Sequence, residues 1–168
     1  MFSDKLQAEL NQQIKEELYS SQIYLAMAAY CADQDLDGFA NFFKVQAEEE
    51  KFHAMKFFNF INEMGGRVLI TGFPDPQNEY DSILDVYEKS LAHEKMVTKR
   101  IYKLMDLAMD EREHATISFL KWFIDEQVEE EAMFQGVIKK LRLIGKDVNA
   151  LYMLDNEMAQ RTWVPPAE

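Results

Sequence analysis

Six polar side chains interrupt the apolar faces of four predicted helices, and their types are those that bind metal ions. In chain order these interruptions are Glu17, Glu50, His53, Glu94, Gln127 and Glu130. Carboxylate oxygens together with a single imidazole nitrogen suit iron or manganese better than a metal that seeks thiolates. Buried carboxylates without cations are costly in free energy, so the pattern predicts a metal centre inside the protein.

The interruptions fall at one height in the predicted structure. On each helix the interruption is centred about 12 to 16 residues after the helix begins, which is roughly 18–24 Å along the helix axis. The middle of a helix is at the same level whichever way the helix runs, so all six side chains can meet. The four glutamates would balance the charge of two Fe²⁺ ions. A misassigned solvent-facing residue explains one such interruption, but it explains four at one height poorly.

Composition limits the class of protein. The chain has 168 residues, of which 48% are hydrophobic and 29% charged, and this favours a single folded domain spanning residues 1–168. The net charge of −12 argues against nucleic-acid binding and is compatible with cation binding. We find no apolar leader at the N-terminus and no apolar run long enough to span a membrane, so we expect a cytoplasmic protein.

Hydrophobic periodicity predicts four long helices and one short one. The expected segments are Asp4 to about Asp33, Phe39 to Met64, Ser82 to a turn near Asp110-Glu111, from that turn to Ile144, and about Val148 to Met158. Ser3 is the expected N-cap of the first helix, and glycines end the second and fourth. Residues 67–80 and the tail 163–166 have no helical pattern.

The lengths of the connections predict the topology. Short turns make the first two helices antiparallel neighbours, and the same holds for the third and fourth. The long segment between the second and third helices, extended, reaches the full length of a helix of that size. The expected fold is therefore all-α: a four-helix bundle with one long crossover and a short fifth C-terminal helix.

The sequence resembles the non-haem ferritins of prokaryotes from Leu6 to about Arg161. Four segments carry the resemblance: Asn11–Ser20, Gln46–Ala54 with its Glu50-x-x-His53, the pair His93-Glu94, and Phe119–Glu131. The resemblance implies a ferroxidase di-iron centre in which Glu50 bridges the two irons. The residues it implies for this centre are Glu17, Glu50, His53, Glu94 and Glu130, with Gln127 beside them. It also implies a third iron site made by Glu49, Glu126 and Glu129 and shared with Glu130.

The resemblance further implies two aromatic residues near the centre. Tyr24 and Trp122 would lie there and could donate electrons, although both also fit a role as core residues with satisfied polar tips. His93 and His114 match no site and are expected on the surface.

The implied function is iron storage and detoxification. Fe²⁺ would be oxidised to Fe³⁺ by O₂ or H₂O₂ and deposited as ferric mineral inside a homo-oligomeric cage of two dozen subunits. The related haem-binding bacterioferritins would carry a haem-ligating methionine beside the motif of the second helix and a Glu-x-x-His on the fourth. Here Lys51 and Phe52 occupy the first place and Gln127-x-x-Glu130 the second, so haem is not expected. The alternative is a di-iron oxygenase or peroxidase acting on a small substrate.

Overall fold

Five helices make up the secondary structure of the computed structural model, which describes residues 2–166. They are α1 (Asp4–Asp33), α2 (Asp37–Glu63), α3 (Ile83–Asp110), α4 (His114–Ile144) and α5 (Val148–Met158). No strand occurs within these described residues. Within residues 2–166, no helix combines the length and hydrophobicity that a membrane span requires.

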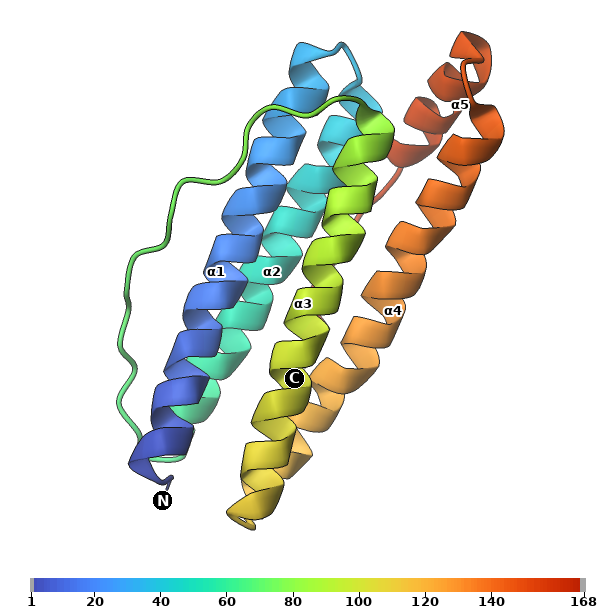
Figure 1. Cartoon of the computed structure of the whole chain (residues 1–168). Helices are drawn as coiled ribbons and strands as arrows, with labels where there is room; N and C mark the ends of the chain where they lie inside the picture. The colour runs from blue at the N-terminus through green and yellow to red at the C-terminus, as the bar shows by residue number, and fades with distance from the viewer. Residues whose placement is uncertain (1, 167–168) are drawn as a thin grey trace.

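The four long helices form a bundle with the predicted topology. The pairs α1 and α2, and α3 and α4, run antiparallel, and each pair is joined by a short turn (Figure 1). Residues 64–82 run the length of the bundle from the end of α2 to the start of α3, which makes these two helices parallel (Figure 1). The expected all-α fold with one long crossover is confirmed.

Side-chain caps fix where the helices begin. The Ser3 hydroxyl accepts a hydrogen bond from the Leu6 amide at 3.0 Å, and the Ser82 hydroxyl accepts one from the Asp85 amide at 3.1 Å. These bonds satisfy backbone N–H groups that the first helical turn leaves without partners. Both predicted starts therefore lie within one residue of the observed ones.

Side chains of α1 hold the extended crossover against the bundle. The Asn11 amide donates to the Arg67 carbonyl at 3.0 Å, and its oxygen accepts from the Leu69 amide at 2.6 Å. Farther along, the Phe73 ring stacks on Tyr19, with ring centroids 5.4 Å apart. A segment without backbone pairing of its own therefore keeps a fixed path (Figure 1).

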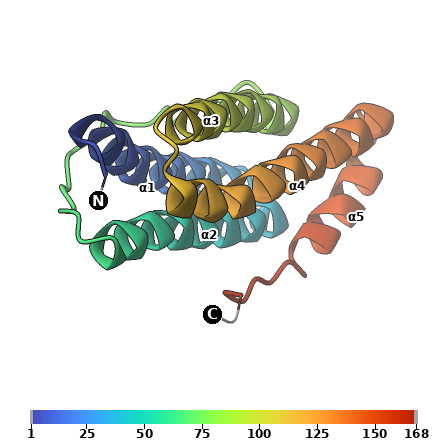
Figure 2. The same cartoon turned by 90° about the horizontal axis from the view of Figure 1, so that it is seen from below.

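The short helix α5 packs across the start of α2 (Figure 2). The Asp155 carboxylate accepts a hydrogen bond from the Phe39 amide at 2.9 Å, so a residue of α5 caps the N-terminus of α2. Gly38 permits this approach: a Cβ built on it would lie 1.7 Å from the Asp155 carbonyl oxygen. The backbones of the two helices are thus in direct contact.

We expect Gly38→Ala to destabilise the chain by about 3 kcal/mol or to displace α5, because the added methyl meets backbone rather than a flexible side chain. Gly136→Ala in α4 is the matched control: nothing lies within 4 Å of its Cβ position. That control should be neutral or stabilising by up to about 1 kcal/mol through helix propensity. Thermal unfolding of both variants checks the prediction, and equal melting temperatures would contradict it.

Candidate metal centre

The six interrupting side chains meet inside the bundle. Each keeps at most 3% of its surface exposed, and together they come from all four long helices. The residues are Glu17 of α1, Glu50 and His53 of α2, Glu94 of α3, and Gln127 and Glu130 of α4. Sequence periodicity thus identified the buried polar positions correctly.

Two apolar clusters enclose this polar layer along the bundle axis. One cluster contains Tyr24, Phe43 and Phe134, and the other contains Ile14 and Phe123 among others. In each helix the chain passes from one cluster through the polar layer into the other. The layer therefore lies at mid-height, where rigid packing on both sides fixes the helices that carry it.

Glu50 is common to two groups of side chains that could each hold a metal ion. In the first group it lies with Glu17 and His53, and in the second with Glu94 and Glu130. Within each group, one ligand atom per residue lies within 4.8 Å of the others. A carboxylate has two oxygens, so a shared glutamate can bind two metal ions at once.

A third group adjoins the first two. It consists of Glu49, His53, Glu126 and Glu130, again with ligand atoms within 4.8 Å of one another. Glu49 is buried and Glu126 half-buried, whereas Glu129 is exposed and belongs to none of the three groups. The structure thus brings two of the three additional glutamates together and leaves Glu129 at the surface.

Unpartnered polar atoms show that these residues fit a metal ion. Glu17 Oε2, His53 Nε2 and Glu130 Oε2 are buried and have no hydrogen-bond partner among the described residues. Such atoms are rare in folded proteins because desolvation without a partner costs free energy. The donor set, carboxylate oxygen with one imidazole, is one that iron accepts.

Glutamine amides orient the other oxygens. Gln13 donates to Glu17 at 2.9 Å, and Gln46 donates to both Glu50, at 2.9 Å, and Glu130, at 3.0 Å. These neutral donors fix the carboxylates without neutralising them. The negative charge of the cluster therefore stays available for cations. Hydrogen bonds of this kind orient the ligands around metal sites.

Burial raises the pKa of Glu17, Glu50 and Glu130 well above the ordinary value for a glutamate, and neighbouring carboxylates raise each pKa further. Protonation is how a buried acidic cluster relieves its charge when no cation is bound. Divalent cations favour the ionised form instead. Metal binding at this cluster is therefore expected to release protons.

Two further residues orient Glu94. The Gln127 amide nitrogen donates to Glu94 Oε2 and to the Thr98 hydroxyl, each at 3.1 Å, and the Tyr24 hydroxyl also donates to Glu94. Gln127 thus presents its donor to a candidate ligand. The Tyr24 ring is held between Phe43 and Phe134, with centroids 6.0 and 5.7 Å away, so it is a core residue with a bonded polar tip.

Trp122 lies against the imidazole of the centre. Its ring meets His53 edge-on, with centroids 5.4 Å apart, and the Lys56 ammonium lies 4.4 Å from the Trp122 ring centroid. The tryptophan is half-buried and so closes one side of the centre.

The surface position expected for His93 is wrong. This histidine is buried, and its Nε2 lies 2.7 Å from the Ser20 hydroxyl between α1 and α3. It was expected at the surface because it matches no site, but the packing of α1 against α3 buries it beside Ser20 and Tyr24. His114 is exposed, as expected.

Sequence reasoning also missed the hydrogen-bonding residues Gln13, Gln46 and Arg161. Their signal was weak: the two glutamines precede Glu17 and Glu50 by four residues, the spacing at which helical side chains meet. Arg161 follows α5, and no local pattern connects it with α2. Its guanidinium nonetheless donates to Gln46 at 2.7 Å and to Glu49 at 3.0 Å.

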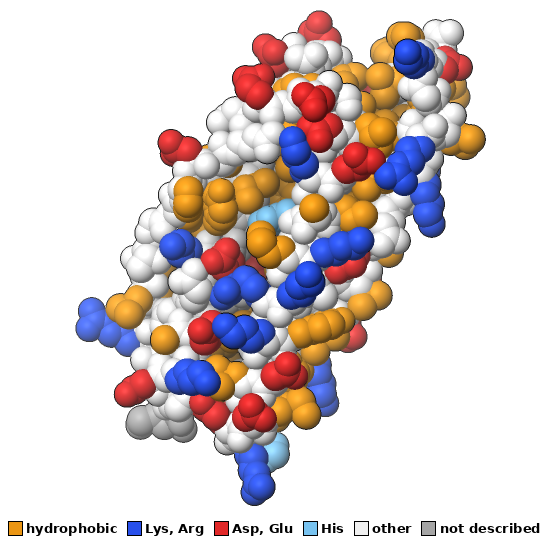
Figure 3. All heavy atoms as spheres, viewed as in Figure 1, with side chains coloured by type: hydrophobic (Ala, Val, Ile, Leu, Met, Phe, Trp, Pro, Cys, Tyr) orange, Lys and Arg blue, Asp and Glu red, His pale blue; other side chains and the backbone are white. Residues whose placement is uncertain are grey.

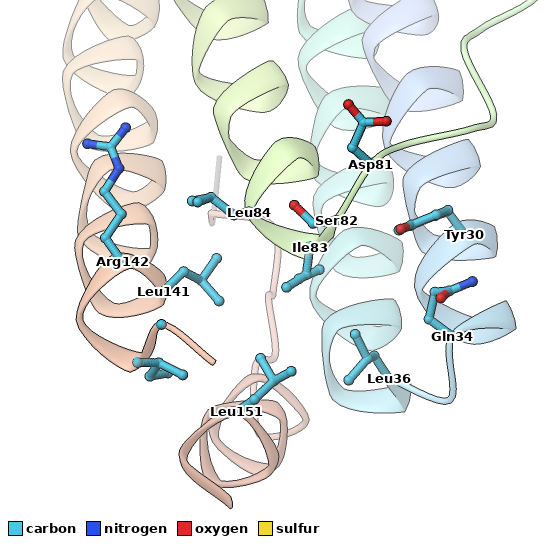
Figure 4. Close-up of a pocket in the computed structure, with 12 residues that line it drawn as sticks. Tyr30, Gln34, Leu36, Asp81, Ser82, Ile83, Leu84, Leu141, Arg142 and Leu151 are labelled. Atoms are coloured by element: carbon cyan, nitrogen blue, oxygen red, sulfur yellow. The ribbon is translucent and has the colours of Figure 1, made fainter. Parts of the chain in front are cut away.

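A separate pocket of about 690 Å³ lies at one end of the bundle, where α1 and α4 end and α3 begins (Figure 4). Tyr30, Leu36, Ser82 and Arg142 are among its lining residues, and Leu151 reaches it from α5. None of the candidate metal ligands lines it. The polar centre and this pocket are thus different places in the molecule.

Comparisons with known proteins agree on one family. A family model described as the ferritin-like domain matches residues 7–144. A bacterial non-heme ferritin of Staphylococcus saprophyticus is 48% identical over 163 residues, covering 97% of this chain and 98% of the relative. One from Staphylococcus aureus is 45% identical with the same coverage.

Solved structures give the same result. An open pore ferritin from the hyperthermophilic archaeon Archaeoglobus fulgidus superposes with a TM-score of 0.96 at 46% identity, covering 96% of this chain and all of that one. A humanized archaeal ferritin gives a TM-score of 0.97 at 45% identity, covering 98% of this chain. The chain therefore belongs to the ferritin family, and its function is iron storage.

Proposed function

We propose that each chain oxidises Fe²⁺ at a paired iron site and passes Fe³⁺ to a mineral stored inside a cage of identical subunits. The observation that carries this proposal is Glu50, which is shared by two buried groups of candidate ligands. Iron is the substrate and the cargo here. The first group would bind one ion through Glu17 and His53, and the second would bind the other through Glu94 and Glu130.

The carboxylates provide charge balance. Four glutamates offset the four positive charges of two Fe²⁺ ions, so a filled centre is neutral inside the bundle. Oxidation of two Fe²⁺ yields two electrons, which reduce O₂ with two protons to H₂O₂, or H₂O₂ with two protons to water. The chain's residues place the ions side by side so that both electrons can leave together.

Tyr24 and Gln127 are proposed to support this chemistry by holding Glu94. Each donates a hydrogen bond to a Glu94 oxygen, which limits how that carboxylate can turn toward the metal. Tyr24 is also proposed as an electron donor because its ring lies beside the centre. We further propose that the centre works without haem: the Phe52 ring packs against Trp122 and Trp163 where a haem ligand would be needed.

The third group is proposed as the exit toward the mineral. It shares His53 and Glu130 with the paired site and adds Glu49 and Glu126, nearer the surface. Burial raises the pKa of Glu126, and the charges of Glu49 and Glu129 add to that shift. Glu129 would then act at longer range, from its exposed position, by attracting cations.

We expect Glu49→Ala or Glu126→Ala to leave the first rapid oxidation intact and to slow later rounds by about tenfold, as changes around a metal site do. The reason is that neither residue belongs to the two groups that share Glu50. Stopped-flow oxidation with successive additions of Fe²⁺ measures both phases. Exposed Glu48→Ala is the control, and loss of the first phase in either variant would place that residue in the paired site.

We propose that the chain, as a single domain, assembles into a 24-subunit cage. Support comes from apolar side chains that an isolated chain leaves in water around α5: Leu143, Val148, Tyr152 and Met153 are each at least 67% exposed. Figure 3 shows hydrophobic side chains at the surface toward this end of the molecule. Contact with other copies would bury them.

Electron microscopy of protein loaded with Fe²⁺ in air tests this function. We expect hollow shells with electron-dense cores. Monomers or dimers that oxidise iron without a core would instead favour an oxygenase or peroxidase. That alternative is disfavoured by the family and by the pocket at the bundle end, which no candidate metal ligand lines.

A further inference from the structure

The segment after α5 returns to α2 and is held there by side chains of that helix (Figure 2). The Asn41 amide donates to the carbonyls of Met158 and Arg161, at 3.2 and 3.1 Å. Two residues later the Trp163 ring contacts Phe52, with centroids 5.3 Å apart. Residues 159–163 therefore lie along the same stretch of α2 that carries the candidate ligands.

Arg161 makes the closest contacts of this segment. One guanidinium nitrogen donates to the Phe42 carbonyl at 3.1 Å, and the group lies 4.2 Å from the Phe42 ring centroid. The other terminal nitrogen donates to Gln46 Oε1 at 2.7 Å and to Glu49 Oε2 at 3.0 Å. The Arg161 and Glu49 side chains are only 17% and 11% exposed, so this ion pair is shielded from water.

The ion pair between Arg161 and Glu49 involves a residue of the candidate metal centre. Among the described residues, Arg161 is the one arginine or lysine with a side-chain nitrogen within 4.0 Å of a carboxylate oxygen of the three metal-binding groups. Glu49 belongs to the third group, beside Glu126 and Glu130. In the metal-free chain, Arg161 therefore supplies the third group with a positive charge that a bound metal ion would otherwise provide.

Arg161 also reaches the paired site through Gln46. Because Arg161 holds Gln46 Oε1, the Gln46 amide nitrogen points the other way and donates to Glu50 and Glu130. One arginine thus fixes an amide that contacts the bridging glutamate. Displacement of Arg161 would loosen this link at the same time as it frees Glu49.

We propose that Arg161 is a tethered counter-ion of the third group. It forms an ion pair with Glu49 when that group holds no metal, and an entering divalent cation displaces it together with the segment 159–163. This inference rests on the proposed function and adds regulation to the same site. The Arg161 guanidinium lies 3.0 Å from the Glu49 carboxylate, so a cation bound at Glu49 would lie close to it. The two positive charges would repel each other strongly because water does not reach them to screen the repulsion. The tail therefore weakens cation binding at the third site relative to the paired site.

Titration of the metal-free full-length protein with Zn²⁺, which does not change its oxidation state, tests the proposal by calorimetry. The parent should bind three Zn²⁺ per chain, one for each group, with one weaker than the others. Arg161→Gln should tighten that weakest site by about tenfold or more, since a repelling charge is removed. Arg161→Lys, which keeps the charge, should leave it weak. Arg142→Gln, which breaks an exposed ion pair with Glu88, is the control.

Trp163 fluorescence supplies a second readout that needs no change at Arg161. In the parent, emission should change as the third Zn²⁺ binds and stay constant during the first two. A Trp163→Phe variant identifies the signal against Trp122, and Glu49→Gln should abolish this step. If Arg161→Gln fails to fold, this titration alone decides the proposal.

A purely structural arginine predicts that Arg161→Gln weakens the third site or leaves it unchanged, and either result would overturn the proposal. A parent that binds only two Zn²⁺ would overturn it while leaving the paired site intact. Absence of tight Zn²⁺ binding would contradict the paired site itself, and the counter-ion with it.

Discussion

Alanine in place of Glu17 or of His53 is expected to slow the first oxidation of Fe²⁺ by at least about 100-fold, beyond the range that outer-shell changes produce. Either change removes one of the three side chains that would bind the first iron. The second iron then lacks a neighbour, and the two-electron reduction of the oxidant can no longer take both electrons at once. The chain should still fold, because each change removes a buried polar atom that has no hydrogen-bond partner in the metal-free chain.

Stopped-flow absorbance after mixing metal-free protein with Fe²⁺ in air measures this rate. Glu48→Ala is the matched control, since Glu48 is an exposed glutamate on α2 only two residues from Glu50. The control should oxidise iron at the parental rate. If Glu17→Ala or His53→Ala did the same, the residue in question would not be a ligand of the paired site.

Glu17→Gln is expected to stabilise the metal-free chain by about 1–3 kcal/mol, although it removes the rapid oxidation. Gln13 donates to Glu17 Oε1, which an amide oxygen can replace, while Glu17 Oε2 has no partner. An amide nitrogen in that place supplies a donor toward Glu50 and removes one charge from the cluster. Burial raises the pKa of Glu17, because the ionised carboxylate loses its hydration there.

The effect should reverse when metal is present. A ligand that binds only the folded chain stabilises it in proportion to the logarithm of its concentration over Kd. Zn²⁺ should therefore raise the melting temperature of the parent more than that of Glu17→Gln, so that the order of stability crosses. Melting curves with and without Zn²⁺ check this, with Glu48→Gln as the control. A variant less stable than the parent without metal would mean that Glu17 supports the fold.

Periodicity in the sequence was enough to predict the helices and the polar layer. Ser3 and Ser82 are sequence-local caps, and both predicted starts were confirmed within one residue. The polar layer could be predicted in the same way, because Glu17 and Glu94 each lie where the apolar face of a helix requires an apolar residue. These features depend on spacing within one helix, which a sequence shows directly.

Contacts between segments that are far apart in the sequence could not be predicted from helical periodicity. Arg161 meets Glu49 only because α5 folds back across α2, and that contact depends on the Gly38–Asp155 approach. The surface position expected for His93 failed for a related reason, since its burial depends on Ser20 of another helix. Where two helices converge, the buried arc is set by their packing and not by either sequence alone.

The bridging role of Glu50 can be tested most directly by anomalous diffraction from crystals soaked in Fe²⁺ without oxygen. We expect two iron peaks in each chain, one among Glu17, Glu50 and His53 and the other among Glu50, Glu94 and Glu130, with one Glu50 oxygen toward each. A single peak, or iron found only away from Glu50, would contradict it.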